Sequence, residues 1–186
     1  MLRATDMAQL LVRPVIKPGD WVVDATVGNG HDTLWLAHLV GPEGRVFGFD
    51  VQPDALAEAA QRVRGLPQVT LILGGHERLS ELLPANAKGR ITAVMFNLGY
   101  LPGADKSIVT TAITTLTAIK HGLNYLAIGG QITLVLYPGH FRGAEEAAAV
   151  RVHAAQLPGN FTAAHYNWIN TLRSGPELVV IERVRE

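Results

Sequence analysis

The chain has no cysteine among its 186 residues. Without cysteine there is neither a disulfide framework nor a cysteine cage for a metal ion. The seven histidines are scattered, with no His-x-x-x-His spacing, so a histidine metal site is not expected either. No apolar run approaches the length of a membrane span, and the N-terminal segment lacks the apolar core of a signal peptide. We therefore expect a cytoplasmic protein that uses neither a metal nor a membrane.

An excess of charge of either sign is also absent. Sixteen basic and sixteen acidic residues give a formal net charge of zero. This balance removes bulk charge as an argument for nucleic-acid binding, although it does not exclude a local basic rim. Hydrophobic residues make up 48% and charged residues 17% of the chain, which indicates a folded α/β protein rather than a disordered one. The length predicts a single domain, residues 1–186.

One stretch combines an acid, a glycine turn and a helical pattern. An apolar run, Trp21–Asp24, ends in an acid and is followed by Gly28 and Gly30, after which residues 31–39 have helical periodicity. A second apolar run, Arg45–Asp50, ends in another acid 20 residues after Gly30. Glycines let a backbone approach a ligand closely, and an acid at this distance can bind both hydroxyls of a ribose. This order is typical of the nucleotide-binding half of a Rossmann-like sheet.

The identity of the nucleotide depends on two positions. The dinucleotide fingerprint G-x-G-x-x-G requires a third glycine where this chain has Thr33. Asp24 would repel a pyrophosphate but attract the ammonium group of an amino acid. S-adenosylmethionine carries such an amino acid and no phosphate. The pattern D-x-x-x-G-x-G resembles the motif of the class I methyltransferases. Many of these enzymes have glycine at the position of Thr26. The alternative is that Asp24 only caps the turn and that the glycines only fit a tight bend.

We expect the cofactor S-adenosylmethionine to contact the glycine loop and the ends of the next strands. His76 follows two glycines after the third predicted strand, near the expected adenine, and is interpreted as a hydrogen-bonding wall rather than a base. Asp32 favours the positive end of a helix dipole whether or not a ligand is bound. The predicted cofactor-binding residues are Asp24, Thr26, Gly28, Asn29, Gly30, Asp32, Thr33, Asp50, Gln52, His76, Glu77 and Asn97.

Strand and helix patterns alternate along most of the chain. Beyond the two strands above, strands are predicted at 69–73, 91–96, 131–137, 161–169 and 178–183. A first helix is predicted after Asp6 as its cap and ends before Pro14, and further helices are predicted at 31–39, 53–63, 77–83, 107–123 and 145–156. Alternation of this kind gives a parallel sheet covered on both faces, and two final strands without a helix between them form an antiparallel hairpin. We predict an α/β, Rossmann-like class I methyltransferase fold with a seven-stranded, mostly parallel sheet.

The loop after the fourth predicted strand carries the best candidates for chemistry. Asn97-Leu98-Gly99-Tyr100 is similar to the [N/D]-P-P-Y motif of enzymes that methylate amines, although both prolines are absent. The Asn97 side-chain oxygen and the Leu98 carbonyl can accept two N–H bonds from an amine, and Tyr100 can stack on a base. The alternative is that Asn97 closes a turn and that Tyr100 is a packing residue.

Other polar residues in predicted loops have weaker support. His140 is the better base candidate of the histidines, although a structural or substrate-orienting role fits it equally well. Lys106, Arg142 and Arg173 can meet RNA phosphates or remain solvated. Enzymes that methylate C5 of a pyrimidine generally add a cysteine to C6 first, and this chain has no cysteine for that route. Methylation of an amine needs only alignment and one proton acceptor.

Three strings of the sequence together resemble a known family. They are DATVGNGHDT (24–33), FNLGYLPGADK (96–106) and YPGHFRGAEE (137–146). They are similar to the bacterial rRNA methylase family, and the resemblance covers residues 7–183. One departure is Gly74-Gly75-His76-Glu77, where a more polar aspartate–serine pair is expected before the histidine.

The resemblance implies a substrate as well as a fold. The family includes the tRNA 5-aminomethyl-2-thiouridine methyltransferase of Gram-positive bacteria, which completes mnm5s2U at the wobble position. It therefore implies methylation of an exocyclic amine in the tRNA anticodon loop, with Asn97, Tyr100 and His140 as catalytic residues and a homodimer as the assembly. Two alternatives stay open: a methyltransferase for rRNA or a small amine, and a non-catalytic adenosine- or RNA-binding protein on the same fold.

Overall fold

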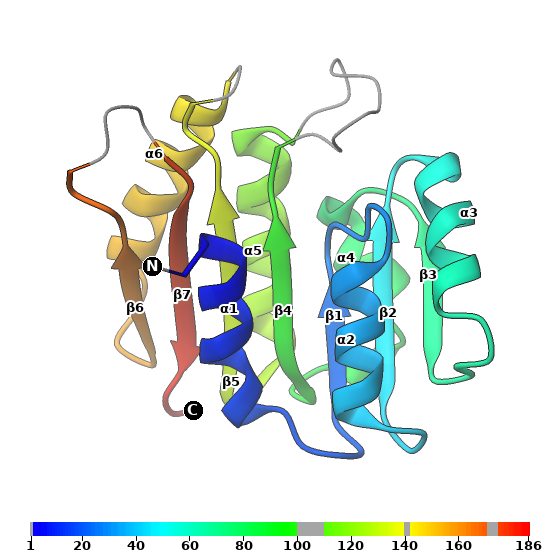
Figure 1. Ribbon diagram of the computed structural model, residues 1–186. Coiled ribbons are helices and arrows are strands. Elements are labelled where there is room, and N and C mark those ends of the chain that lie inside the picture. Colours follow the sequence, from blue (N-terminus) through cyan, green and yellow to red (C-terminus); the bar gives the residue numbers. More distant parts are fainter. Residues whose placement is uncertain (1, 100–109, 140–141, 171–174) are drawn as a thin grey trace.

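The computed structural model describes residues 2–99, 110–139, 142–170 and 175–186. Seven strands form one sheet in the order β3-β2-β1-β4-β5-β7-β6 (Figure 1). Strands β1 to β5 pair in parallel, and β7 runs antiparallel to both of its neighbours. The strands are β1 Trp21–Asp24, β2 Arg45–Asp50, β3 Val69–Leu73, β4 Ile91–Asn97, β5 Leu126–Leu136, β6 Phe161–Tyr166 and β7 Glu177–Arg183. The predicted seven-stranded sheet with a C-terminal antiparallel hairpin is confirmed.

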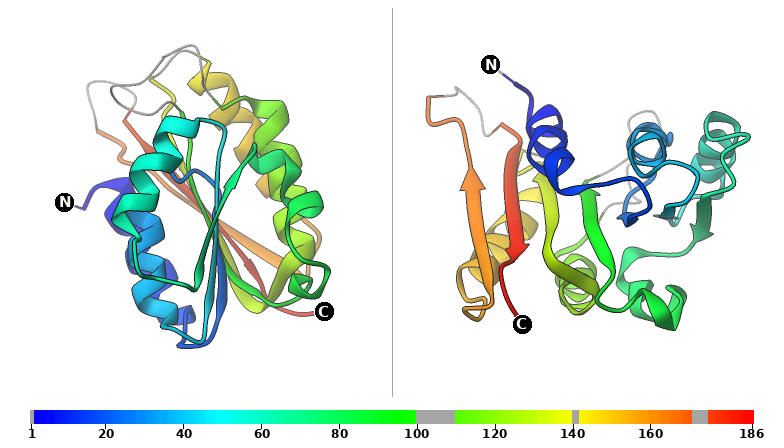
Figure 2. Two further views of the ribbon diagram at one scale, coloured as in Figure 1. Left: turned by 90° about the vertical axis from the view of Figure 1, so that its right-hand side faces the viewer. Right: turned by 90° about the horizontal axis from the view of Figure 1, so that it is seen from below.

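Helices cover both faces of this sheet (Figures 1 and 2). Helices α1, α2 and α3 lie on one face, and α4, α5 and α6 lie on the other. The helices are α1 Ala4–Val12, α2 His31–Val40, α3 Pro53–Arg62, α4 Leu79–Leu82, α5 Ala112–Tyr125 and α6 Gly143–Ala155, with short 3-10 turns at Arg13–Val15, His76–Arg78 and Ala85–Ala87. Among the residues described, no helix is both long and apolar enough to cross a membrane.

Two apolar cores lie on the two faces of the sheet. One includes Val22 and Met95 of the strands with Leu36 of α2, and the other includes Phe96 with Ile119 of α5. Central parallel strands are buried on both faces, which explains why β4 and β5 read as nearly continuous apolar runs. The sheet is therefore a rigid support whose carboxyl edge carries the polar strand ends.

Several predicted boundaries differ from the structure, and three of them have a local reason. Helix α5 begins at Ala112, whereas the sequence predicted a start at residue 107. The Thr111 side chain caps the helix by accepting the Thr114 N–H. Residues 107–109 of the predicted helix lie outside the described part. Strand β6 ends at Tyr166 because its partner β7 begins only at Glu177. Strand β5 starts earlier than predicted, and a bulge at Gly129, with φ of +79°, absorbs the register shift against β4.

Candidate functional site

A cavity of about 620 Å³ opens at the carboxyl edge of the sheet, between the ends of β1, β2, β3 and β4 and the start of α5. This volume lies within the range of small-molecule sites. Nine of the twelve predicted cofactor residues line it: Thr26, Gly28, Asn29, Asp32, Asp50, Gln52, His76, Glu77 and Asn97. The structure therefore brings these nine residues together around one cavity.

Asp50 ties the glycine turn to the end of β2. Its Oδ2 accepts the Gly28 N–H at 2.7 Å, and its Oδ1 accepts the Gln52 N–H at 2.9 Å. Gly28 has a φ of +49°, in the left-handed region where glycine carries no steric penalty. A carboxylate has about four lone-pair positions, so both oxygens retain capacity for ligand hydroxyls. Asp50 can thus support the turn and bind a ribose with the same group.

Asp24, Gly30 and Thr33 do not line the cavity. Asp24 is 1% exposed, and its carboxylate accepts the Thr33 hydroxyl at 2.6 Å and the Thr26 N–H at 3.2 Å. Gly30 has a φ of +78°, and a Cβ there would lie 2.9 Å from the Cβ of Ala59 on α3. These three residues support the wall from behind, whereas the sequence alone placed Asp24 beside the ligand's amino group.

Burial above all, then the nearby Asp32 carboxylate and to a smaller extent Asp50, raise the pKa of Asp24 to about 7. The folded protein therefore holds a proton that the unfolded chain, with an ordinary pKa of 3.8, releases at lower pH. We predict that this group's stabilisation is complete below pH 3.8 and is lost as pH rises through about 7.

Urea unfolding at a series of pH values tests this prediction against an Asp24→Asn variant. The difference in free energy of unfolding between wild type and the variant should shift in favour of the variant as pH rises, and then level off above neutral pH. A difference that does not depend on pH over this interval would contradict the prediction.

His76 forms a buried, neutral part of the cavity wall. It is 7% exposed, its Nδ1–H donates to the Ala25 carbonyl at 3.3 Å, and its ring meets Phe96 edge-on at 5.6 Å. Burial lowers its pKa, so the ring stays neutral at physiological pH. Its Nε2 has no hydrogen-bond partner among the described residues. The ring of His76 is therefore a neutral part of the wall's packing, and its role toward a ligand stays a prediction.

Asn97 is the exposed polar end of β4. Its backbone N–H donates to the Thr26 hydroxyl at 2.7 Å, and its Oδ1 accepts the Tyr137 hydroxyl at 2.8 Å. Burial, with the Asp32 charge, raises the pKa of Tyr137, which keeps that hydroxyl protonated as a donor. The Asn97 oxygen keeps a second lone pair for an incoming N–H. Tyr137 was missed as a site residue, although its position directly after a strand at the same edge was a usable signal.

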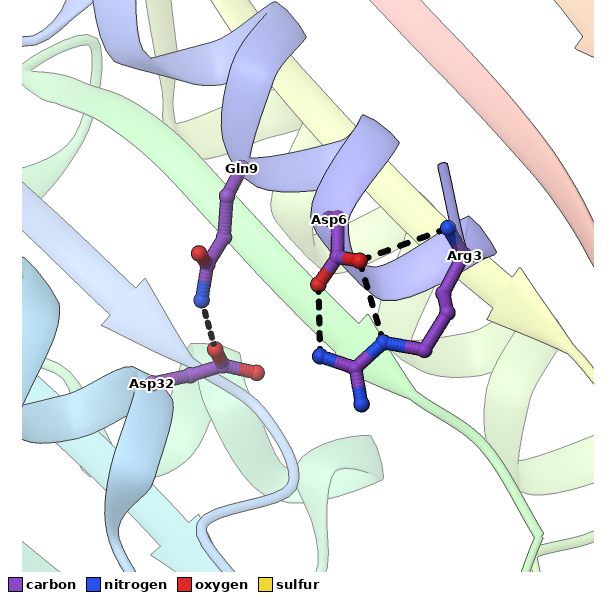
Figure 3. Close-up of polar contacts among 4 residues, drawn as sticks. All are labelled: Arg3, Asp6, Gln9 and Asp32. Carbon is purple, nitrogen blue, oxygen red and sulfur yellow. Dashed lines mark hydrogen bonds and ion pairs between the residues drawn. The ribbon is translucent and has the colours of Figure 1, made fainter. Parts of the chain in front are cut away.

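Helix α1 also reaches the site, which the sequence did not indicate. The Gln9 side chain donates to Asp32 Oδ1 at 2.7 Å, as Figure 3 shows. On the same helix Arg3 and Asp6 form a charged pair at 2.8 Å, with Arg3 largely exposed. A hydrogen bond across 23 residues has no local pattern, so no sequence signal could have found Gln9.

Four candidates lie outside the described residues: Tyr100, Lys106, His140 and Arg173. Arg142 is described and exposed, precedes α6 and has a left-handed φ of +61°. It is not among the residues that line the cavity. Within the described ranges, no group of three His, Asp or Glu side chains is arranged to hold a metal ion.

The comparisons with known proteins agree with this geometry. The family model described as "Putative rRNA methylase" matches residues 46–182, most of the chain. The chain belongs to this rRNA methylase family. A crystal structure described as a "putative rRNA-methylase" from Clostridium thermocellum has a TM-score of 0.93 at 38% identity, covering 98% of each chain.

The descriptions of two further relatives name a ligand and a substrate. A methyltransferase from Streptococcus mutans, solved in complex with SAH, has a TM-score of 0.87 at 34% identity and covers 98% of this chain and 99% of that chain. The "tRNA (mnm(5)s(2)U34)-methyltransferase, chloroplastic" of Arabidopsis thaliana is 41% identical over 84% of this chain. The chain spans only 60% of that relative's length. The predicted class I methyltransferase fold is confirmed by these structural neighbours.

Proposed function

We propose that this protein is an S-adenosylmethionine-dependent tRNA methyltransferase that methylates the aminomethyl nitrogen of 5-aminomethyl-2-thiouridine at the wobble position. The observation that carries the proposal is the exposed Asn97 acceptor beside Tyr137, in the same cavity as the Asp50-held glycine turn. The 41% identity to a relative named for mnm5s2U supports this substrate over other amines.

The cavity fits S-adenosylmethionine by the chemistry of its donors and acceptors. Asp50 offers acceptors for the two ribose hydroxyls, and the buried ring of His76 forms the wall beside the proposed adenine position. Asp32 places a carboxylate where the ligand's ammonium group gains Coulomb energy. The SAH bound in the Streptococcus mutans relative supports the same assignment. Thr26, Asn29, Gln52 and Glu77 complete the proposed contacts around the cavity.

When bound, S-adenosylmethionine supplies a methyl group on a positively charged sulfur. The Asn97 oxygen and the Leu98 carbonyl orient the substrate amine, so that its lone pair points at that methyl group. The new N–C bond takes its electrons from the amine, while the electrons of the broken C–S bond return to sulfur. The amine also releases one proton, for which His140 is the proposed acceptor, with water as the alternative.

The identity of the RNA substrate is tested by comparing methyl transfer to different RNAs. The protein is incubated with methyl-labelled S-adenosylmethionine and either tRNA bearing the aminomethyl group, the same tRNA without it, or small ribosomal subunits. We expect label only in the first RNA, because only that RNA carries the aminomethyl group of the proposed substrate. Label in ribosomal RNA would instead favour the rRNA alternative, which a 38% identity over 99 residues to "Ribosomal RNA small subunit methyltransferase H" of Frankia alni keeps open.

Recognition of tRNA also needs contacts beyond the cavity. An anticodon loop is single-stranded, so its base can enter a pocket at modest cost. Tyr100 is the proposed stacking residue, and Lys106, Arg142 and Arg173 are the proposed phosphate contacts. The homodimer implied by the family stays a prediction, and light scattering of the protein in solution tests it.

A further inference from the structure

Glu146 is a buried carboxylate that the proposed chemistry does not use. It lies on α6, is 4% exposed, and burial raises its pKa. Its Oε1 accepts the Thr115 hydroxyl at 2.6 Å, and its Oε2 accepts the Thr110 hydroxyl at 2.9 Å. Among the described residues no cation pairs with this carboxylate. Burying such a group is costly, and an apolar side chain at such a site is often equally stable or more so. The position therefore calls for an explanation other than stability.

The contacts of Thr110 lead from Glu146 to the cavity. The Thr110 hydroxyl donates to Glu146 and accepts the Gly99 N–H at 2.9 Å, while the Thr110 N–H donates to the Gly99 carbonyl at 3.1 Å. Thr110 and Gly99 both line the cavity, whereas Glu146 and Thr115 do not. This reciprocal pair joins the two ends of segment 100–109.

Three consecutive backbone N–H groups in this turn are held by three different elements. The Asn97 N–H donates to Thr26 after β1, the Leu98 N–H donates to the Val135 carbonyl on β5 at 3.0 Å, and the Gly99 N–H donates to Thr110. The first two partners belong to the sheet and its loops. Among the described residues the third is held by Thr110, whose own hydroxyl is held by Glu146. Glu146 is thus the outermost support of the turn that carries Asn97.

We propose that Glu146 is a positioning residue: through Thr110 it fixes the Asn97–Gly99 turn so that the acceptors for the substrate amine keep their place in the cavity. The inference rests on the proposed function, because it assigns the substrate amine to this turn. An ionised Glu146 also gives the Thr110 hydroxyl one orientation, since the single proton must point at the carboxylate. The Thr110 oxygen then keeps a lone pair directed at the Gly99 N–H, which donates to it.

The test compares Glu146→Gln with a matched control, Glu177→Gln. Glu177 is also buried, at 7% exposure, but it accepts from Arg151 at 2.7 Å and contacts His165 at 2.8 Å, away from the cavity. We expect Glu146→Gln to lower kcat about tenfold or more with little change in cofactor affinity, because small misplacement of reacting groups is expensive. Glu177→Gln should leave kcat unchanged and lower the melting temperature.

Two variants of Thr110 separate positioning from general support of the fold. Thr110→Val removes the hydroxyl and should lower kcat as Glu146→Gln does, whereas Thr110→Ser keeps the hydroxyl and should restore most of the activity. Amide hydrogen exchange at Gly99 gives a reading that needs no substrate. Exchange should be faster in Glu146→Gln and Thr110→Val than in wild type or Glu177→Gln.

The outcomes are distinct from failure of the proposed function. Slower turnover together with faster exchange at Gly99 supports the inference. Unchanged turnover in Glu146→Gln, or slower turnover with unchanged Gly99 exchange, overturns it. If wild type itself does not methylate tRNA bearing the aminomethyl group, the proposed function fails and the exchange at Gly99 alone decides the role of Glu146.

Discussion

Replacing Asp50 by alanine should nearly abolish cofactor binding. The carboxylate holds the N–H groups of Gly28 and Gln52 and lines the cavity at the proposed ribose position. A hydrogen bond to a charged group contributes about 1.5–3 kcal/mol, so losing two ribose contacts should weaken binding by about 100-fold or more. Isothermal calorimetry with S-adenosylhomocysteine measures this directly, because that ligand binds without turnover.

Two further variants control for damage to the fold. Asp50→Asn keeps an acceptor for one of the two backbone N–H groups and should retain the fold while still losing much of the affinity. Asp54→Ala, in the first turn of α3 and away from the cavity, removes a nearby acid and should bind normally. Wild-type affinity in a folded Asp50→Ala protein would refute the ribose assignment.

Replacing Asn97 by alanine should slow turnover by about 100-fold while leaving cofactor affinity nearly intact. The side chain is exposed, so truncation removes little packing, and its backbone N–H still donates to Thr26. The lost oxygen is the acceptor that orients the amine, and misplacement of a reacting group costs about 100-fold in rate. Single-turnover methyl transfer gives the rate, and calorimetry gives the affinity.

Tyr137→Phe provides the graded control for this prediction. It removes the hydroxyl that holds Asn97 Oδ1 but retains the ring, so its loss of rate should be smaller than that of Asn97→Ala. Full turnover by Asn97→Ala with intact cofactor binding would remove Asn97 from the mechanism. Equal and large losses of affinity in both variants would instead assign the pair to the cofactor.

The sequence predicted those parts of the site that follow from local chain order. The acid–glycine–helix pattern ending in Asp50 and the polar end of β4 at Asn97 each lie within one short stretch, and parallel strands bring their carboxyl ends to one edge. Their convergence on a single cavity follows from the topology. The sheet itself was predictable for the same reason, since strand and helix patterns alternate.

The parts that the sequence did not predict depend on contacts between distant segments. Gln9 lies on α1, which packs on β4, β5 and β7, and from there it meets Asp32 at the start of α2; Glu146 meets Thr110 because α6 packs on α5. Asp24 was assigned to the ligand because its charge was considered without its burial, whereas the fold covers it and pairs it with Thr33. Such side-chain pairings are set by packing, which periodicity does not encode.

Nucleoside mass spectrometry tests the central claim most directly. Transfer RNA bearing 5-aminomethyl-2-thiouridine is incubated with the protein and S-adenosylmethionine, digested to nucleosides and analysed beside an Asn97→Ala reaction. We predict that this nucleoside gains the mass of one methylene group, with fragments that place the methyl on the aminomethyl nitrogen, and that the gain is lost in the variant. An unchanged nucleoside, from a protein that still binds the cofactor, would contradict the account.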